Sequence, residues 1–538
     1  MKNIKVLDCT LRDGGYIVDS IFGDTTISCI IDKLTNANID IVEVGFLKNG
    51  DYVKGSSTFN NISQIKKFLP TDKKSTSFAA MIDFGRYDID NLPQNDGENI
   101  DAIRNCFFKK DRYRAIEYSY KIQEKGYKLF VQPVDILGYN DKELLELIEI
   151  TNKIKPLAFS IVDTFGSMYE EDLVRIFSLL NHNLDKDISI GFHSHNNLQL
   201  SFALAQKIIQ LASNDRNVII DSTLCGMGRG AGNTNTELII QYLNKKYNYG
   251  YDINTILDLI DLYITPISNK KKWGYSIPYF IAGMYSCHVH NITYLLDKHK
   301  IRSKDMQNVI SCLDPQIKKR YDYTNLEQIY ISYFNNEIND EATLKELKTI
   351  LQDKVILILA PGLSLRKYEN RIKELQNNEN LITISVNFYN KNFNSDFLFF
   401  SNAMRLDKVY NKYTYDKLKE QNIKIIVTSS IKTAKYDYNV NYNKLINRNY
   451  QHFDNAVILL LNLLVNLGFK TVYTAGFDGY ILENSNNYIE NDLQTNIDND
   501  EKFLINKEIK AMLKELKDKA HNGINIEFIT PSIYESEK

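Results

Sequence analysis

The segment Ile188-Ser-Ile-Gly-Phe-His-Ser-His-Asn-Asn-Leu198 decides the interpretation of the first half of the chain, because an apolar run leads directly into two closely spaced histidines. Side chains two residues apart on a strand point to the same face, so His193 and His195 can reach one common ligand. Imidazole nitrogens are frequent ligands of divalent metals. The segment therefore predicts a buried strand that carries a candidate metal site at its end.

Similar apolar runs recur before and after this segment and alternate with amphipathic stretches of helical period. The runs that we interpret as strands are Ile4–Leu11, Ile39–Leu47, Thr76–Ile82, Ile100–Phe107, Tyr127–Leu137, Leu157–Phe165, Ile188–His195 and Val218–Cys225. The helical stretches between them include Asp111–Lys125, Lys142–Ile154, Tyr169–Leu180 and Gln199–Leu211. Eight strands that alternate with helices are typical of a (β/α)8 TIM barrel. The competing fold is a doubly wound sheet, but no G-x-G-x-x-G sequence follows the first strand.

Polar residues stand at the ends of the predicted strands, where a barrel gathers its chemistry. The positions are Thr10 to Tyr16 after the first strand, Glu43 on the second, Asp163 and Thr164 on the sixth, His193 and His195 on the seventh, and Gly226 to Asn233 after the eighth. We expect these side chains to converge on one mouth of the barrel.

Three ordered motifs carry a family resemblance: Leu7-Asp-Cys-Thr-Leu-Arg-Asp-Gly14, His193-Ser-His195 and Gly226-x-Gly-x-x-x-Gly-Asn233. They resemble the signatures of the DRE-TIM metallolyases, also called the HMG-CoA-lyase-like or pyruvate-carboxyltransferase-domain family. That family includes the isopropylmalate and homocitrate synthases, HMG-CoA lyase and the 4-hydroxy-2-oxovalerate aldolases, which the first half of this chain resembles most.

The resemblance implies four protein ligands for a divalent cation: Asp13, His193 and His195, with Asn233 as the fourth. It also implies that Arg12 stabilises an enolate and that Glu43 lies beside Arg12 and Asp13. A carboxylate and two imidazoles that leave open positions suit a Lewis-acid metal better than a closed structural zinc. We expect Mn²⁺, with Mg²⁺, Co²⁺ or Zn²⁺ as alternatives.

The implied activity is that of a class II aldolase, a lyase that forms or cleaves a carbon–carbon bond through a metal-stabilised enolate of pyruvate or a related 2-oxo acid, with an aldehyde as the second substrate. The hydroxy-oxovalerate aldolases carry a histidine three residues after the metal-binding aspartate, where this chain has Tyr16. Tyr285, in a helical extension that resembles theirs, is implied to reach back over the barrel mouth. Tyr16, Tyr285, a metal-bound water or His288 could therefore move the proton.

Several alternatives remain open. A Claisen-type synthase that joins an acyl-CoA to a 2-oxo acid shares all three motifs, and Arg229 in the glycine loop resembles the synthases. A nucleotide-binding, glycan-assembly protein with an inactive barrel is a rival of another class. Schiff-base chemistry on Lys48 or Lys109 is disfavoured, because both lie in charged stretches. Simple packing for Tyr285, and a partly exposed helix for His288 and His290, are the structural alternatives.

The pattern predicts three parts: a barrel over residues 1–265, a helical extension over 266–349 and an α/β domain over 350–538. Predicted helices from the end of the barrel part through the extension are Asn254–Tyr263, Pro278–Lys298, Ser303–Ser311 and Asn325–Phe334, with Glu341–Leu351 closing the set. The last part has predicted strands at Lys354–Ala360, Leu381–Val386, Asp396–Phe400, Lys424–Thr428 and Thr471–Ala475, and helices at Arg366–Gln376 and Asp454–Leu467. This order indicates a Rossmann-like domain.

The turn Pro361-Gly-Leu-Ser-Leu365 follows a strand and precedes a helix, where free backbone N–H groups bind anions. The region resembles, distantly, the bacterial sialyltransferases that use a CMP-activated sugar, although Pro361 precedes Gly362 here and His452 does not align with a catalytic histidine. We expect Gly362, Ser364 and Asn387 to contact a nucleotide or nucleotide-sugar. Glycosyl transfer and a purely structural or oligomerising role stay open, and the fusion suggests surface-glycan precursor biosynthesis.

Composition limits the remaining partners. The formal net charge is −2, and basic residues are dispersed, so we expect no nucleic-acid partner. The longest apolar run, Ala456 to Val465, is too short to span a bilayer, and no signal peptide is evident, so we expect a cytoplasmic protein without a membrane span. The six cysteines lack metal-site spacing and read as buried thiols. A homo-oligomer of unspecified size is a further expectation.

Overall fold

The computed structural model describes residues 3–299, 301–334, 338–433, 435–482, 486–494, 497–518 and 523–535. It divides into two compact units, Met1–Leu326 and Glu327–Lys538. The division falls within helix α14 (Tyr323–Phe334), so the predicted extension contributes to both units. Within the described residues, no helix has the length and apolar character needed to cross a membrane.

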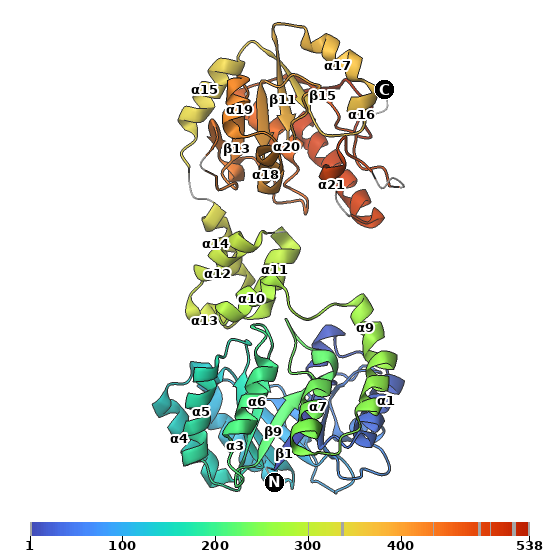
Figure 1. Cartoon of the computed structure of the whole chain (residues 1–538), viewed down its shortest axis with the longest axis vertical. Coiled ribbons are helices and arrows are strands. Elements are labelled where there is room, and N and C mark those ends of the chain that lie inside the picture. Colours follow the sequence, from blue (N-terminus) through green and yellow to red (C-terminus); the bar gives the residue numbers. More distant parts are fainter. Residues whose placement is uncertain are drawn as a thin grey trace. The chain divides into compact units, whose positions relative to one another are not determined.

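The first unit contains a closed barrel of eight parallel strands, which confirms the predicted fold (Figure 1). Its strands are β1 (Ile4–Asp8), β2 (Ile41–Leu47), β4 (Ser77–Asp83), β5 (Ala102–Phe107), β6 (Lys128–Pro133), β7 (Ala158–Asp163), β8 (Ser189–Ser194) and β9 (Val218–Ser222). The pairing of β1 with β2 closes the barrel. A short strand that the sequence did not predict, β3 (Thr58–Phe59), extends β2 outside the barrel.

Helices surround the barrel because each carries one apolar face that packs against the strands. They are α1 (Asp24–Asn36), α2 (Ile62–Lys66), α3 (Arg112–Glu124), α4 (Asp141–Ile154), α5 (Glu170–Asn183), α6 (Ser201–Leu211), α7 (Thr236–Tyr247) and α8 (Ile253–Leu259). The four helices predicted between the strands match α3 to α6 to within a few residues.

The interior of the barrel is layered, because alternate residues of each strand point inward. One layer is apolar and includes Ile41, Ala102 and Ile219. Two residues further along the same strands stand Glu43, Arg104 and Asp221, all buried. The barrel interior therefore changes from apolar to charged toward the carboxyl ends of the strands, where the predicted site residues lie.

The helical extension differs from the prediction at one position that matters for the site. The stretch Pro278–Lys298 is two helices, α10 (Ile277–Met284) and α11 (Val289–His299), and not one. Ser286 between them has a left-handed backbone, with φ of 48°, which an α-helix cannot contain. The break leaves His288 on a connecting segment between the helices.

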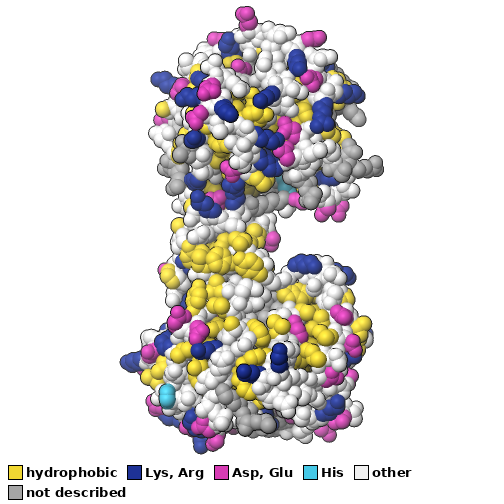
Figure 2. Space-filling model, in the orientation of Figure 1, with side chains coloured by type: hydrophobic (Ala, Val, Ile, Leu, Met, Phe, Trp, Pro, Cys, Tyr) yellow, Lys and Arg dark blue, Asp and Glu magenta, His cyan; other side chains and the backbone are white. Residues whose placement is uncertain are grey.

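The rest of the extension is helical and exposes apolar side chains. Its other helices are α9 (Thr265–Lys270), α12 (Ser303–Ser311), α13 (Pro315–Lys318) and α14. Exposed apolar residues on α10 include Ile277, Phe280 and Met284. Figure 2 shows apolar side chains gathered over the extension, while charges of both signs are interspersed over the rest of the visible face.

The second unit is built on one parallel sheet in the order β14-β13-β12-β11-β10-β15-β16. Its strands are β10 (Val355–Leu359), β11 (Leu381–Val386), β12 (Phe397–Phe400), β13 (Lys424–Thr428), β14 (Tyr438–Val440), β15 (Thr471–Ala475) and β16 (Asn525–Phe528). The five predicted strands are present, and β14 and β16 are additional edge strands. The arrangement agrees with the expected Rossmann-like α/β domain.

Helices cover both faces of this sheet. One face packs on α15 (Glu341–Leu351), α20 (Ala456–Leu467) and α21 (Asn499–Asp518). The other packs on α16 (Ser364–Lys367), α17 (Glu369–Gln376), α18 (Ala403–Lys412) and α19 (Tyr415–Glu420). Strand order reverses between β10 and β15, and such a switch point is where open α/β sheets form ligand crevices.

Candidate metal centre and active-site cavity

His193 on β8 and His195 just after it lie beside Asp13. His193 Nε2 is 3.1 Å and His195 Nε2 is 3.8 Å from the same oxygen, Oδ2 of Asp13. All three side chains are buried, and their ligand atoms are close enough together to hold one metal ion. Asp13 lies just beyond β1, where the chain turns into a short 3-10 helix.

Buried polar atoms without partners support a cation here. Oδ1 of Asp13, Oδ1 of Asn233 and Nδ1 of His195 have no hydrogen-bond partner within the described residues. Leaving such atoms unpaired costs about 1–3 kcal/mol each, and a bound cation would satisfy the oxygens. A Cβ atom on Gly228 would lie 2.2 Å from Nδ2 of Asn233, so only glycine lets this loop approach the site. The donor set therefore fits an oxygen- and imidazole-bound divalent ion.

Arg12 and Glu43 lie where the resemblance implied. The Arg12 guanidinium donates from Nε to Oε2 of Glu43 and from NH1 to Oδ2 of Asp13, both at 2.8 Å. Its NH2 is buried and has no partner among the described residues. Burial alone would lower the Arg12 pKa, but Glu43 and Asp13 raise it well above its usual value, so the guanidinium stays charged.

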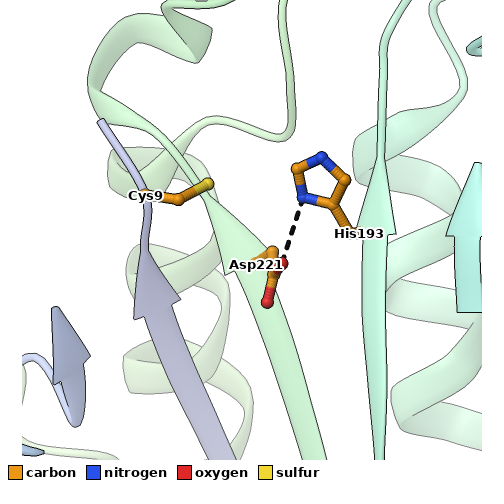
Figure 3. A group of neighbouring side chains, drawn as sticks. All are labelled: Cys9, His193 and Asp221. Carbon is orange, nitrogen blue, oxygen red and sulfur yellow. Dashed lines mark ion pairs between the residues drawn. The ribbon is translucent and has the colours of Figure 1, made fainter. Parts of the chain in front are cut away.

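Two buried residues that the sequence analysis missed complete the centre. Nδ1 of His193 lies 3.0 Å from Oδ2 of Asp221 on β9, which is the interaction drawn in Figure 3. Asp221 also pairs with Arg104 on β5, whose NH1 is 2.9 Å from Oε2 of Glu43. A closed circuit of ion pairs thus runs through Arg12, Asp13, His193, Asp221, Arg104 and Glu43. The sequence did contain a signal for both residues, because Arg104 and Asp221 are charged residues inside mostly apolar strand segments.

The circuit fixes the charges of the acids. Burial alone would raise the Asp13 pKa, but Arg12 and the two histidines lower it well below its usual range. Burial would likewise raise the Asp221 pKa, and Arg104 and His193 lower it. The Asp221 carboxylate lies at Nδ1 of His193 and so orients the ring with Nε2 facing Asp13. Carboxylate partners of metal-binding histidines act in the same way.

Cys9, His193 and Asp221 form a second close group, drawn in Figure 3. The Cys9 Sγ donates to the backbone oxygen of Ser222 at 3.3 Å. Burial raises the thiol pKa well above its usual value, and a protonated thiol is a poor metal ligand. We therefore interpret this group as the support of His193, and Asp13, His193 and His195 as the candidate metal ligands.

A cavity of about 480 Å³ opens above the centre, and its wall includes Arg12, Tyr16, His193 and His195. The helical extension supplies its roof through His288, His290 and the segment Lys319 to Tyr321. His288 is thus a cavity residue, which corrects the interpretation of a merely exposed helix. Neither Lys48 nor Lys109, considered for Schiff-base chemistry, lines it.

The structure places the two candidate tyrosines differently. Tyr16 lines the cavity, and the Arg229 guanidinium lies 4.1 Å from its ring centre. Burial of the phenol raises its pKa, so Tyr16 keeps its proton at neutral pH and is not primed as a base. Tyr285 does not line the cavity and instead contacts Gln307 and Lys318, so it does not reach over the barrel mouth.

The HMGL-like family model matches residues 3–265, the part of the chain that forms this barrel and its metal centre. Residues 3–265 are an HMGL-like domain.

Named relatives match the HMGL-like domain at low identity. A 4-hydroxy-2-oxovalerate aldolase of Geobacillus genomosp. 3 is 26% identical over 50% of this chain and 78% of its own length. An oxaloacetate decarboxylase of Mycobacterium tuberculosis is 24% identical over 47% of this chain and 74% of its own. The solved HMG-CoA lyase of Bacillus subtilis is 13% identical, covers 50% of this chain and 95% of its own, and has a TM-score of 0.40. The HMGL-like domain is an enzyme, a metal-dependent carbon–carbon lyase.

The second unit has its own crevice, of about 140 Å³, at the switch point between β10 and β15. Gly362 and Asn387, two of the three residues proposed from sequence to contact a nucleotide, line it together with Arg405 and Tyr488. Ser364 does not line it, because its backbone N–H donates to Oδ2 of Asp478 at 2.8 Å. The premise of free N–H groups at this helix start is therefore wrong: the Asp478 carboxylate occupies the position expected for an anion.

Arg405 is the cation of this crevice. Its side chain is 9 % exposed, and NH2 donates to the backbone oxygen of Leu493 at 2.7 Å. NH1 is buried and has no partner within the described residues. The sequence analysis missed Arg405, which lies in the first turn of α18, because nothing in its local pattern distinguishes it from a surface arginine.

Proposed function

We propose that the HMGL-like domain is a class II aldolase that forms or cleaves a carbon–carbon bond of a 2-oxo acid such as pyruvate, with an aldehyde as the other partner. The observation that carries the proposal is the convergence of Asp13, His193 and His195 beside Arg12. Arg12 and both histidines line one cavity, and Asp13 lies buried behind them. Two named relatives, an aldolase and a decarboxylase, support it at low identity.

Each residue of the centre has a task in this reaction. The chemistry supplied by a divalent cation bound to Asp13, His193 and His195 is Lewis-acid polarisation of the substrate carbonyl. Arg12 donates from its unpartnered NH2 to the oxygen that becomes negative as the bond breaks. Glu43 holds Arg12 in place through Nε, and Asp221 holds His193. The buried ion pairs keep these positions fixed before substrate binds.

We infer Mn²⁺ as the ion, with Mg²⁺, Co²⁺ and Zn²⁺ as alternatives, because a carboxylate, an amide oxygen and imidazoles together suit ions of intermediate character. Metal analysis of the purified protein, followed by reconstitution with each ion in turn, tests this choice. A metal-dependent screen for pyruvate release from 4-hydroxy-2-oxo acids tests the activity. Release of thiol from acetyl-CoA in the presence of a 2-oxo acid would instead favour the Claisen-type synthase.

We further propose that the second unit binds a nucleotide or nucleotide-sugar, and that the chain acts in the synthesis of a surface-glycan precursor. The support is the crevice at the switch point, lined by Gly362 and Asn387, and the buried Arg405 with an unpartnered NH1. Because Asp478 occupies the start of α16, we assign the anionic group of the ligand to Arg405 and not to Ser364. Calorimetry of the full chain with CMP and other nucleotides tests the site, and no heat with any of them would contradict it.

A further inference from the structure

The barrel cavity is lined by many more cations than anions. Its cationic side chains are Arg12, Arg86, Lys110, Arg229, Lys319 and Arg320, and its one carboxylate is Asp83. Three of the cations have acidic partners: Arg12 pairs with Asp13 and Glu43, Arg86 with Asp83 and Lys319 with Asp135. Lys110, Arg229 and Arg320 have no carboxylate partner among the described residues. Positive charge is therefore left over at the cavity wall.

Arg229 faces His288 in an arrangement that lacks an acceptor. The backbone N–H of His290 lies 3.2 Å from Nδ1 of His288, and because an amide N–H can only donate, Nδ1 must be the acceptor. Burial lowers the His288 pKa to about 3, so the ring is neutral and carries its single proton on Nε2. That Nε2–H lies 3.4 Å from NH1 of Arg229, which is also a donor. Two donors thus adjoin with no acceptor between them.

Both groups are held in place. Arg229 stands between Gly228 and Gly230 in the loop after β9, and its guanidinium rests on the Tyr16 ring. The backbone N–H of His288 donates to the oxygen of Lys318 at 2.8 Å, just after the break between α10 and α11. A small cleft is lined by Arg229, His288 and the metal-ligand candidate His195, so the donor pair adjoins the metal centre.

We propose that Arg229 and His288 bind an anionic group, a carboxylate or a phosphate, carried by the aldehyde substrate. This inference rests on the proposed aldolase function and names the class of its second substrate. An oxygen of the anion supplies the acceptor that the two donors lack, as charge-assisted hydrogen bonds to arginine commonly do. Arg320 and Lys110 add positive charge at the same wall and favour entry of anions over neutral aldehydes.

Matched aldehyde pairs test the inference on the full-length, metal-loaded protein with pyruvate as the common substrate. Succinic semialdehyde is compared with butanal, and glyceraldehyde 3-phosphate with glyceraldehyde, so that the first pair tests a carboxylate and the second a phosphate. We expect kcat/KM to favour the charged member of at least one pair by about tenfold or more, the worth of a hydrogen bond to a charged group. Arg229→Gln should abolish that preference, whereas Arg175→Gln, which removes an exposed cation on α5, should preserve it.

Equal kcat/KM for both members of each pair, or a preference that survives Arg229→Gln, would overturn the inference. An equal fall in kcat/KM for the charged and the uncharged aldehyde in Arg229→Gln, with a raised KM for pyruvate, would also overturn the inference. The anion bound by Arg229 would then be pyruvate. Exchange of the pyruvate methyl protons needs no aldehyde and tests the aldolase function separately. If exchange is absent, calorimetric binding of succinic semialdehyde and of glyceraldehyde 3-phosphate still decides the anion site. Binding of either compound that Arg229→Gln weakens about tenfold supports the site, and binding of neither contradicts it.

Discussion

Nδ1 of His193 lies 3.0 Å from Oδ2 of Asp221, and Nε2 of the same ring lies 3.1 Å from Oδ2 of Asp13. The ring therefore joins a support on β9 to a ligand after β1, across the inside of the barrel. Arg104 forms ion pairs with both Asp221 and Glu43, and Glu43 also pairs with Arg12. The orientation of His193, a candidate metal ligand, and that of Arg12 are thus coupled.

The coupling predicts the effect of Asp221→Asn. The amide can no longer hold the His193 ring as a carboxylate does, so we expect metal affinity to fall by about 10- to 100-fold, the usual effect of losing such a partner. Calorimetric titration of the metal-free protein with Mn²⁺ measures it. Asp215→Asn, an exposed acid paired with Lys186, is the control. Unchanged affinity in Asp221→Asn would show that Asp221 does not position the ligand.

Metal affinity should also depend on pH. Burial alone would lower the His193 pKa, but contacts with Asp13 and Asp221 raise it above its ordinary value in the metal-free protein. A histidine that binds a metal must be neutral, so metal binding must displace this proton, and affinity should increase as pH rises through the His193 pKa and then level off. Titrations in buffers of different ionisation enthalpy count the released proton. Affinity that is independent of pH, without proton release, would contradict the assignment.

The Tyr16→Phe variant distinguishes two roles for Tyr16, that of a general base and that of a residue that only lines the cavity. The phenol pKa is raised by burial, and the ring supports Arg229, a contact that phenylalanine retains. We expect turnover to fall by less than about tenfold with an unchanged pH–rate profile, whereas loss of a general base costs about 10² to 10⁴. A loss in the larger range, together with loss of the increase in rate that deprotonation of a general base produces as pH rises, would make Tyr16 the base.

Arg405→Gln tests the crevice of the second unit. If NH1 binds the anionic group of a nucleotide, affinity should fall by about tenfold or more, because a charge-assisted hydrogen bond is lost. Arg371→Gln, on α17 and outside the crevice, is the matched control. Equal affinities of the two variants would exclude Arg405 from the site.

Sequence reasoning predicted those parts of the site that local pattern encodes. The apolar runs predicted the barrel and its strand ends, and the spacing of His193 and His195 predicted that they share one face, because a strand repeats every two residues. Asp13 was named from the family resemblance, and the structure places it beside both histidines. Asp221 and Arg104 were not predicted as site residues, because their partners lie on other strands and only the closed register of the barrel brings them together.

The same limit explains the errors. The sequence predicted one helix over Pro278–Lys298, but the single left-handed residue Ser286 interrupts it. This interruption places His288 on the segment between α10 and α11, where it lines the cavity. Tyr285 was carried over from the family resemblance, and its direction depends on how the extension packs. The anion site expected at Ser364 required knowledge of Asp478, which is distant in sequence.

Exchange of the pyruvate methyl protons for deuterium, followed by proton NMR, tests the central claim most directly, because it requires the metal centre, Arg12 and a proton acceptor but no second substrate. We predict exchange by the metal-loaded wild-type protein, its loss on chelation and recovery with Mn²⁺. Asp13→Ala should reduce it by at least about 100-fold, and Asp215→Ala should leave it intact. Exchange that persists in Asp13→Ala, or that is absent from the metal-loaded wild type, would contradict a metal-dependent aldolase centred on Asp13, His193 and His195.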